Sequence, residues 1–218
     1  MEIRHHAYLY AILCKAILEE AGEEKGEKLI HIFTQNYGIA RGRRMKEHSP
    51  DGGMNDFFIA GEWKGKEGEN LSSLSYEKDR TVSRVTKCAW YDTWKDYGLV
   101  KEGSHYCRYI DRAICEGYGS DFSLEVPEAI GLGSARCIFI WNAPADQKKV
   151  EETKREYILP FDFHCRELLK HALAVLDEDL RKAVYEKCRA QFEEEFPDTD
   201  LFKASSLQTE KEDLYNHD

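Results

Sequence analysis

The sequence lacks a long apolar run. No stretch approaches the roughly 20 apolar residues that a membrane-spanning helix needs. Residues 1–24 have an apolar middle, but Lys15 interrupts it and acidic residues follow. This order differs from that of a signal peptide, in which basic, apolar and small residues follow one another. We therefore expect no membrane partner and a cytoplasmic location.

An excess of basic residues is missing too. The chain contains 31 Lys and Arg against 41 Asp and Glu, which gives a net charge of −10. Such a protein gains no field-driven attraction to phosphate backbones, so we expect no nucleic-acid partner, although a local basic patch could still bind an anion. Hydrophobic residues make up 42% of the 218 residues, which is enough for one domain with a substantial core.

The paired spacings typical of metal sites are also absent from the sequence. Its seven cysteines include no CxxC pair, and the histidines form no HxxxH pair. This pattern favours free thiols in a reducing compartment over a disulfide framework. We expect most of the thiols to be small core residues and one or two to be available for chemistry. We expect neither a metal nor another cofactor.

The pattern of hydrophobic residues places helical blocks on both sides of a strand-rich middle. Helical spacing covers residues 6–47 and 160–196, and the core between them spans 55–142. This order predicts an α+β fold: an antiparallel sheet packed against helices, with N-terminal helices and a long C-terminal helical segment. We expect a single α+β domain over residues 1–196, followed by a polar tail at 197–218.

Within the middle block, β-branched residues and turn signals predict the individual elements. Strands are expected around 57–59, over 71–88 with a hairpin turn at 77–80, and at 122–130 and 134–142; a short aromatic helix is expected at 89–100, and a charged linker at 145–156.

The helical segment near residue 40 ends in a cluster of basic residues that includes Arg41 and Arg43. Cations near a helix C-terminus are favoured by the dipole, so this cluster is interpretable as an ordinary solvated helix end. Alternatively, the cluster forms a clamp for a substrate carboxylate, because arginine offers a bidentate fork.

The stretch SHYCRYIDRAICEGY, residues 104–118, carries the strongest candidates for chemistry. Ser104 is a good N-cap, which would place Cys107 in the first turn of a helix. Backbone N–H groups and the helix dipole favour an anion there, so we expect a lowered pKa and a reactive thiolate.

Asp111 falls on the same narrow stripe of that helix as Cys107, Ile114 and Tyr118. A carboxylate beside an apolar arc must be hydrogen-bonded, paired or neutralised, and desolvation raises its pKa. A general acid or base has this property. Helix geometry alone leaves two interpretations open: a catalytic pair, or a core thiol beside a structural carboxylate.

Two further thiols and one histidine are candidates for the same site. Cys88 ends a strand just before a helix, and Cys137 lies within a strand on its aromatic face, so either could meet Cys107 in space. His164 begins a helix and could reach a cleft, while a hydrogen-bonded structural histidine is its favoured role.

The run CAWYDTWKDYGLVKEGSHYCRYIDRAICEGYGSDFSLEVPEAIGLGSARCIFIW, residues 88–141, resembles the L-2-amino-thiazoline-4-carboxylic acid hydrolase family. The matching positions are Cys88, Gly98-Leu99, Tyr106-Cys107, Asp111, Gly117-Tyr118 and Cys137. The segments YGIARGRRM (37–45) and PFDFHC (160–165) extend the resemblance over most of residues 6–170. The chain departs from the family at 117–120, where Gly-Tyr-Gly-Ser stands in place of the frequent Gly-(Phe/Tyr)-Asn-Pro.

The resemblance implies a hydrolase that acts on carbon–nitrogen bonds of a small cyclic amidine resembling 2-aminothiazoline-4-carboxylate. Cys107 would attack the C=N carbon and Asp111 would move the proton, or Asp111 would activate water directly while Cys107 lines the pocket. Arg41 or Arg43 would hold the substrate carboxylate. Substrate contacts would come from Cys88, Tyr118, Cys137 and His164.

Two other function classes remain open. A non-enzymatic, sensor-like domain would bind a small molecule in an aromatic pocket with a ligand-facing cysteine. Thiol chemistry on a soft metal or an organometal would use two cysteines and an aspartate. The sequence leaves the exact substrate and a homo-oligomeric state open.

Overall fold

The computed structural model describes residues 1–119, 122–153 and 157–202. Its elements in chain order are α1 (Ile3–Ala21), α2 (Glu23–Glu47), α3 (Met54–Ile59), β1 (Leu71–Tyr76), β2 (Thr81–Lys87), α4 (Ala89–Asp96), α5 (Val100–Tyr118), β3 (Leu124–Glu128), the 3-10 turn η1 (Ile130–Leu132), β4 (Cys137–Trp141), α6 (Gln147–Glu152), α7 (Phe161–Ala174) and α8 (Glu178–Glu195). None of the helices in these ranges is long and apolar enough to cross a bilayer.

The strands form one four-stranded antiparallel sheet in the order β1-β2-β4-β3. The hairpin of β1 and β2 turns at the predicted residues 77–80, where Glu77 N–H donates to the carbonyl of Arg80. β2 pairs with β4 in a register that sets Val85 opposite Cys137. The α+β fold, with an antiparallel sheet packed against helices, is therefore confirmed.

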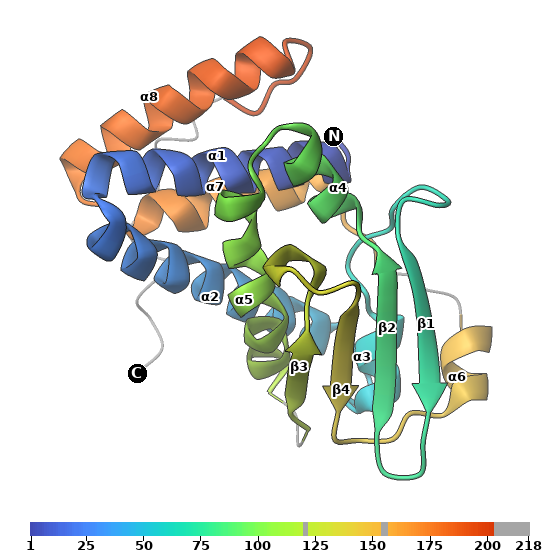
Figure 1. Ribbon diagram of the computed structural model, residues 1–218. Helices are drawn as coiled ribbons and strands as arrows, with labels where there is room; N and C mark the ends of the chain where they lie inside the picture. The colour runs from blue at the N-terminus through green and yellow to red at the C-terminus, as the bar shows by residue number, and fades with distance from the viewer. Residues whose placement is uncertain (120–121, 154–156, 203–218) are drawn as a thin grey trace.

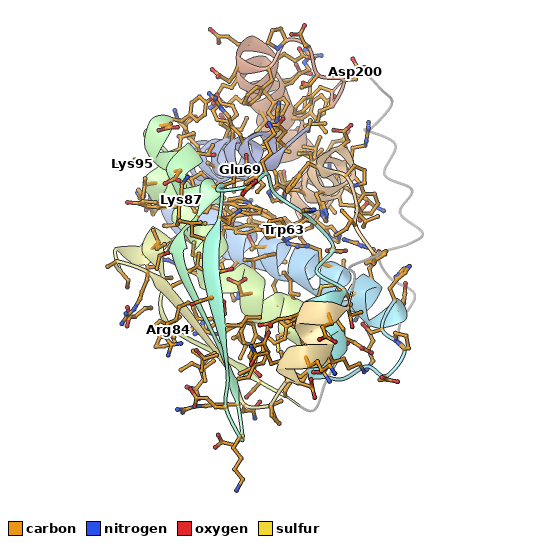
Figure 2. The ribbon with its side chains drawn as sticks, turned by 90° about the vertical axis from the view of Figure 1, so that its right-hand side faces the viewer. Trp63, Glu69, Arg84, Lys87, Lys95 and Asp200 are labelled. Atoms are coloured by element: carbon orange, nitrogen blue, oxygen red, sulfur yellow. The ribbon has the colours of Figure 1, made fainter. Side chains whose placement is uncertain are left out.

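The helices lie together on one side of the sheet (Figure 1). α5 packs along α2 and also contacts β3 and η1, while α8 packs on α1 at the far side of the helical layer. In the view turned by 90°, Arg84 of β2 lies on the outer side of the sheet and Trp63 on the side of the helices (Figure 2). The inner face of the sheet and α5 thus enclose the centre of the molecule.

Two segments differ from the prediction. Residues 57–59 belong to helix α3 and not to a strand, because the carboxylate of Asp56 accepts hydrogen bonds from the N–H groups of Asp51 and Gly52 and folds the preceding loop into a helix start. The segment predicted as a charged linker contains α6, whose N-cap Asp146 accepts from the N–H of Lys149.

The C-terminal helical segment is a pair of helices, α7 and α8, and Asp177 caps the second by accepting from the N–H of Leu180. The chain continues to pack after α8: Leu201 and Phe202 are buried, and the ring of Phe202 lies against Tyr185. Residues 203–218 of the expected polar tail lie outside the described residues.

Glycines allow α2 and α5 to approach closely. A Cβ atom on Gly42 of α2 would overlap the backbone of Ile114, and one on Gly117 of α5 would overlap the backbone of Ile39. Neither obstacle is a flexible side chain, so the two helices could not keep their separation with a larger residue at either position. This contact places the C-terminal half of α2 directly against α5.

Replacing Gly42 with alanine should therefore lower the free energy of unfolding by about 2–3 kcal/mol, because the added methyl group forces the helices apart. Chemical denaturation of the two proteins measures the difference. Gly53→Ala is the matched control, since a Cβ atom there meets nothing within 4 Å. A Gly42→Ala variant as stable as Gly53→Ala would contradict the close contact.

Candidate active site

A cavity of about 340 Å³ lies between α5, α4 and the inner face of the sheet. Alternate residues of the strands face it, as the two-residue period of a strand requires: Ser83 and Val85 from β2, and Cys137 and Phe139 from β4. Aromatic side chains supply much of the remaining wall, including Trp90, Trp94 and Tyr106. The cavity is thus a mostly apolar pocket with a few polar groups, the usual form of a small-molecule site.

Five of the eight candidate residues converge on this cavity, and Arg41 of α2 is one of them. Cys88, Cys107, Asp111 and Cys137 all line it, although they come from different elements. Cys88 lies between β2 and α4, Cys107 and Asp111 lie one turn apart on α5, and Cys137 begins β4. Three thiols and one carboxyl group therefore face the same space.

The prediction that Cys107 lies at the start of its helix was wrong. α5 begins at Val100, so Cys107 sits about two turns into it, away from the positive end of the dipole. Ser104 does not cap the helix, because its hydroxyl donates to the carbonyl of Lys101. Burial, together with the neighbouring Cys88 and Asp111, raises the pKa of the Cys107 thiol well above its ordinary value. The expected lowered pKa is thus reversed, and the thiol is protonated at neutral pH.

Cys88 is the thiol that lies at a helix start. It is the N-cap residue of α4. Burial raises its pKa to about 11, while the backbone N–H groups of Tyr91 and Trp90 act in the opposite direction. The sequence placed Cys88 correctly between a strand and a helix, and burial keeps the net shift of its pKa upward.

Among the ionisable groups that line the cavity, Asp111 has the pKa that lies nearest to neutral pH. Burial raises the pKa of Asp111 to about 6, although the positive charge of Arg41 acts in the opposite direction. A carboxyl group with this pKa changes its charge within the working range of most enzymes and can both accept and donate a proton. The arrangement can therefore support acid–base chemistry on a bound small molecule.

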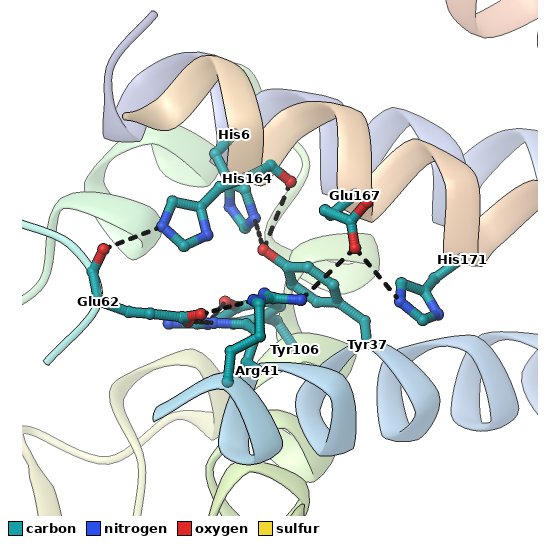
Figure 3. A network of polar contacts seen from close by, with 9 residues as sticks. His6, Tyr37, Arg41, Glu62, Tyr106, His164, Glu167 and His171 are labelled. Carbon is teal, nitrogen blue, oxygen red and sulfur yellow. Dashed lines mark hydrogen bonds and ion pairs between the residues drawn. The ribbon is translucent and has the colours of Figure 1, made fainter. Parts of the chain in front are cut away.

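Arg41 reaches the cavity from α2 and is held by a buried acidic residue (Figure 3). Its Nε donates to Glu62 Oε2 at 2.8 Å and its Nη1 donates to the hydroxyl of Tyr106 at 3.1 Å. These two bonds use Nε and one of the two terminal nitrogens of the guanidinium. The second oxygen of Glu62 accepts from Nε of Arg44 at 2.9 Å, and Glu62 is fully buried.

A chain of hydrogen bonds runs from Trp90 in the cavity wall to the backbone of Glu62. Trp90 Nε1 donates to His6 Nδ1 at 3.1 Å, so the proton of His6 is on Nε2, which lies 3.0 Å from the hydroxyl of Tyr37. Tyr37 donates to the carbonyl of His164, whose Nε2 lies 3.2 Å from the carbonyl of Glu62. These bonds orient Trp90 in the cavity wall and hold the backbone of Glu62.

Three predicted site residues lie away from the cavity. Arg43 is exposed, because two residues along α2 from Arg41 lead to the opposite face of the helix. Tyr118 is buried, and its hydroxyl donates to the carbonyl of Gly53. His164 is buried in the hydrogen-bond chain, and burial lowers its pKa to about 4. Tyr118 and His164 therefore contact other parts of the core, as a structural role requires.

Sequence reasoning missed Glu62 and Asn70. Glu62 has a φ of +57°, and nothing in its glycine-rich surroundings indicates a buried partner for Arg41. Asn70 lines the cavity, and its Oδ1 accepts from the N–H of Ala89 at 3.0 Å. This bond fixes the amide, whose Nδ2 is buried and has no partner among the described residues.

Across residues 1–119, 122–153 and 157–202, no group of three or more histidine, cysteine or acidic side chains has the arrangement of a metal site.

Replacing Glu62 with glutamine should lower the free energy of unfolding at pH 7 by about 3–5 kcal/mol, because it leaves Arg41 buried without its countercharge. Burial acts to raise the pKa of Glu62, but Arg41 and Arg44 outweigh it and lower the pKa below its usual 4.5. The difference should therefore be complete above pH 4.5 and shrink as the pH falls further.

Denaturant unfolding of both proteins from pH 7 down to pH 3 measures this effect. Glu24→Gln is the control, because Glu24 pairs with Lys28 on the exposed surface and should contribute no more than about 0.5 kcal/mol. Equal losses in the two variants would refute the buried ion pair.

The comparisons with known proteins agree with the resemblance read from the sequence. The family model described as L-2-amino-thiazoline-4-carboxylic acid hydrolase matches residues 1–141, a range that includes all the cavity residues discussed above. No curated protein and no solved structure matches the chain. The family name supports a hydrolase-like function with a small-molecule substrate. Because the matched residues make up more than half of the chain, the protein belongs to the L-2-amino-thiazoline-4-carboxylic acid hydrolase family.

Proposed function

We propose that the protein is a hydrolase that opens a small cyclic amidine of the 2-aminothiazoline-4-carboxylate type. The observation that carries this proposal is the convergence of Asp111 and three thiols on one cavity of about 340 Å³. The family membership supports the same class of reaction. A mostly apolar pocket with a carboxyl group of raised pKa suits proton transfer to a neutral heterocycle.

The reaction requires two proton transfers. The oxygen of a water molecule bonds to the amidine carbon, and a proton from that water reaches the ring nitrogen. The tetrahedral intermediate then expels the ring sulfur: the carbon–sulfur bond breaks, the hydroxyl proton leaves and the sulfur gains a proton, which yields N-carbamoyl-cysteine. Both carbon–nitrogen bonds survive in this product. For this substrate, water therefore adds across the C=N bond and the ring carbon–sulfur bond breaks. The sequence-based expectation that a carbon–nitrogen bond is cleaved does not hold for this reaction.

We assign both proton transfers to Asp111. As a carboxylate it accepts a proton from water and delivers it to nitrogen, and it repeats the exchange between the hydroxyl and the sulfur. The raised pKa of Cys107 favours this route over attack by a thiolate, since only a small fraction of the thiol is ionised at neutral pH. Cys107 then lines the pocket as a neutral, polarisable group.

Two donors are suitable for the substrate carboxylate. Arg41 and Asn70 both line the cavity, and the amide nitrogen of Asn70 is buried without a partner among the described residues. A charged nitrogen and a neutral one can each bond one carboxylate oxygen. Arg43, the other arginine considered from the sequence, is exposed and does not line the cavity.

Incubation of the purified protein with 2-aminothiazoline-4-carboxylate, followed by mass spectrometry, tests the proposal directly. Formation of N-carbamoyl-cysteine at a rate proportional to enzyme concentration is the expected result. Saturable binding of the compound without product would instead support the non-enzymatic, sensor-like alternative.

Asp111→Asn should reduce kcat by about 10²–10⁴-fold, because the amide can neither accept nor deliver the protons. For the unmodified protein, kcat/KM should fall about tenfold per pH unit as the pH drops below about 6, where Asp111 becomes protonated. The variant should also gain up to about 3 kcal/mol of stability at pH 8, since it no longer buries a charge, and lose that gain by pH 4. A pH profile without an inflection near 6 would contradict this role for Asp111.

Cys107→Ala and Cys107→Ser should both retain turnover within about one order of magnitude, because neither variant removes the group that moves the protons. Steady-state kinetics beside Asp111→Asn provides the comparison. A loss in both cysteine variants as large as that in Asp111→Asn would mean that the thiol attacks the substrate.

A further inference from the structure

A second cavity of about 200 Å³ adjoins the first. The two share part of their walls, and the shared residues are Arg41, Phe58, Trp63, Asp111 and Ile114. Asp111 and Arg41 therefore lie at the neck between a larger chamber, which holds the thiols, and a smaller chamber. A single five-membered ring with one carboxylate fills only part of this combined space.

One residue of the smaller chamber, Trp141, has an indole N–H without a partner among the described residues. Trp141 at the end of β4 lines it and is 6% exposed, and its Nε1 is buried with no hydrogen bond among the described residues. The buried Trp90 and Trp94 differ, since their Nε1 atoms donate to His6 at 3.1 Å and to the carbonyl of Ala7 at 2.9 Å. A buried donor without an acceptor is unfavourable, so Trp141 is the indole to which a ligand would supply an acceptor.

Apart from this donor and the two charged residues at the neck, the smaller chamber is apolar. Phe57, Met45 and Leu124 contribute to it, and the ring of Phe58 meets the indole of Trp141 edge to face at 4.9 Å. A charged group deep in such a chamber would lose its hydration without gaining a countercharge. An apolar or aromatic group that carries one hydrogen-bond acceptor fits it.

We propose that the substrate is a cyclic amidine with an apolar, ring-sized substituent that bears one acceptor oxygen. The substituent enters the smaller chamber and accepts a hydrogen bond from Trp141 Nε1, while the reacting carbon lies at the neck beside Asp111. This inference rests on the proposed hydrolase function for the amidine, but the ligand chemistry of the smaller chamber is tested without turnover.

Acetophenone and ethylbenzene are suitable probes, because both carry a phenyl ring and only acetophenone carries an acceptor. Their dissociation constants are measured by NMR titration for the unmodified protein, for Trp141→Phe and for Trp63→Phe. The ratio of the two constants should shift about fivefold against acetophenone in Trp141→Phe, as expected for one neutral hydrogen bond of about 1 kcal/mol. The ratio should stay unchanged in Trp63→Phe, which alters the shared wall but keeps the donor.

An unchanged ratio in Trp141→Phe, or an equal shift in Trp63→Phe, would overturn the proposal. A second measurement needs no Trp141 variant: the protein has four tryptophans, and their indole N–H signals are assigned from phenylalanine variants of the other three. Acetophenone, but not ethylbenzene, should move the Trp141 signal downfield. Failure of either probe experiment is distinguishable from failure of the hydrolase proposal, which depends only on formation of N-carbamoyl-cysteine.

Discussion

The close contact between α2 and α5 is the constraint on which the candidate site depends. Gly42 and Gly117 let the two backbones meet, and this contact carries Arg41 of α2 to the hydroxyl of Tyr106 on α5. A wider separation would leave the guanidinium short of the cavity wall. Because two small residues set this distance, the position of a charged group in the cavity follows from the absence of side chains elsewhere.

Asp111 has a raised pKa although an arginine lies nearby. A carboxylate beside a free guanidinium normally has a lowered pKa. Here burial outweighs the charge of Arg41 at Asp111, while Arg41 and Arg44 each donate a hydrogen bond to Glu62. The two carboxyl groups thus have opposite shifts: Glu62 has a lowered pKa and holds the arginine as an anion at neutral pH, while Asp111 can exchange protons.

The sequence predicted the features that depend on local pattern, and missed those that depend on contacts between distant segments. Alternation along 134–142 placed Cys137 on the face that turned out to line the cavity, and the helical stripe placed Asp111 beside the apolar side of α5. The start of α5 was missed because Ser104 satisfies the statistics of an N-cap yet bonds to Lys101. Glu62 was missed because its partner lies on α2, and no local pattern records that pairing.

The charges that the cavity can hold bear on which group begins the reaction. Three thiols in one cavity suggest nucleophilic chemistry, but burial raises the pKa of each of them: Cys88, Cys107 and Cys137. Each additional thiolate would also be repelled by ionised Asp111, so the cavity can hold one anion more readily than two. Ionisation of the carboxyl group therefore keeps the thiols neutral. A water molecule activated by Asp111 is then the nucleophile that the electrostatics of the cavity favour.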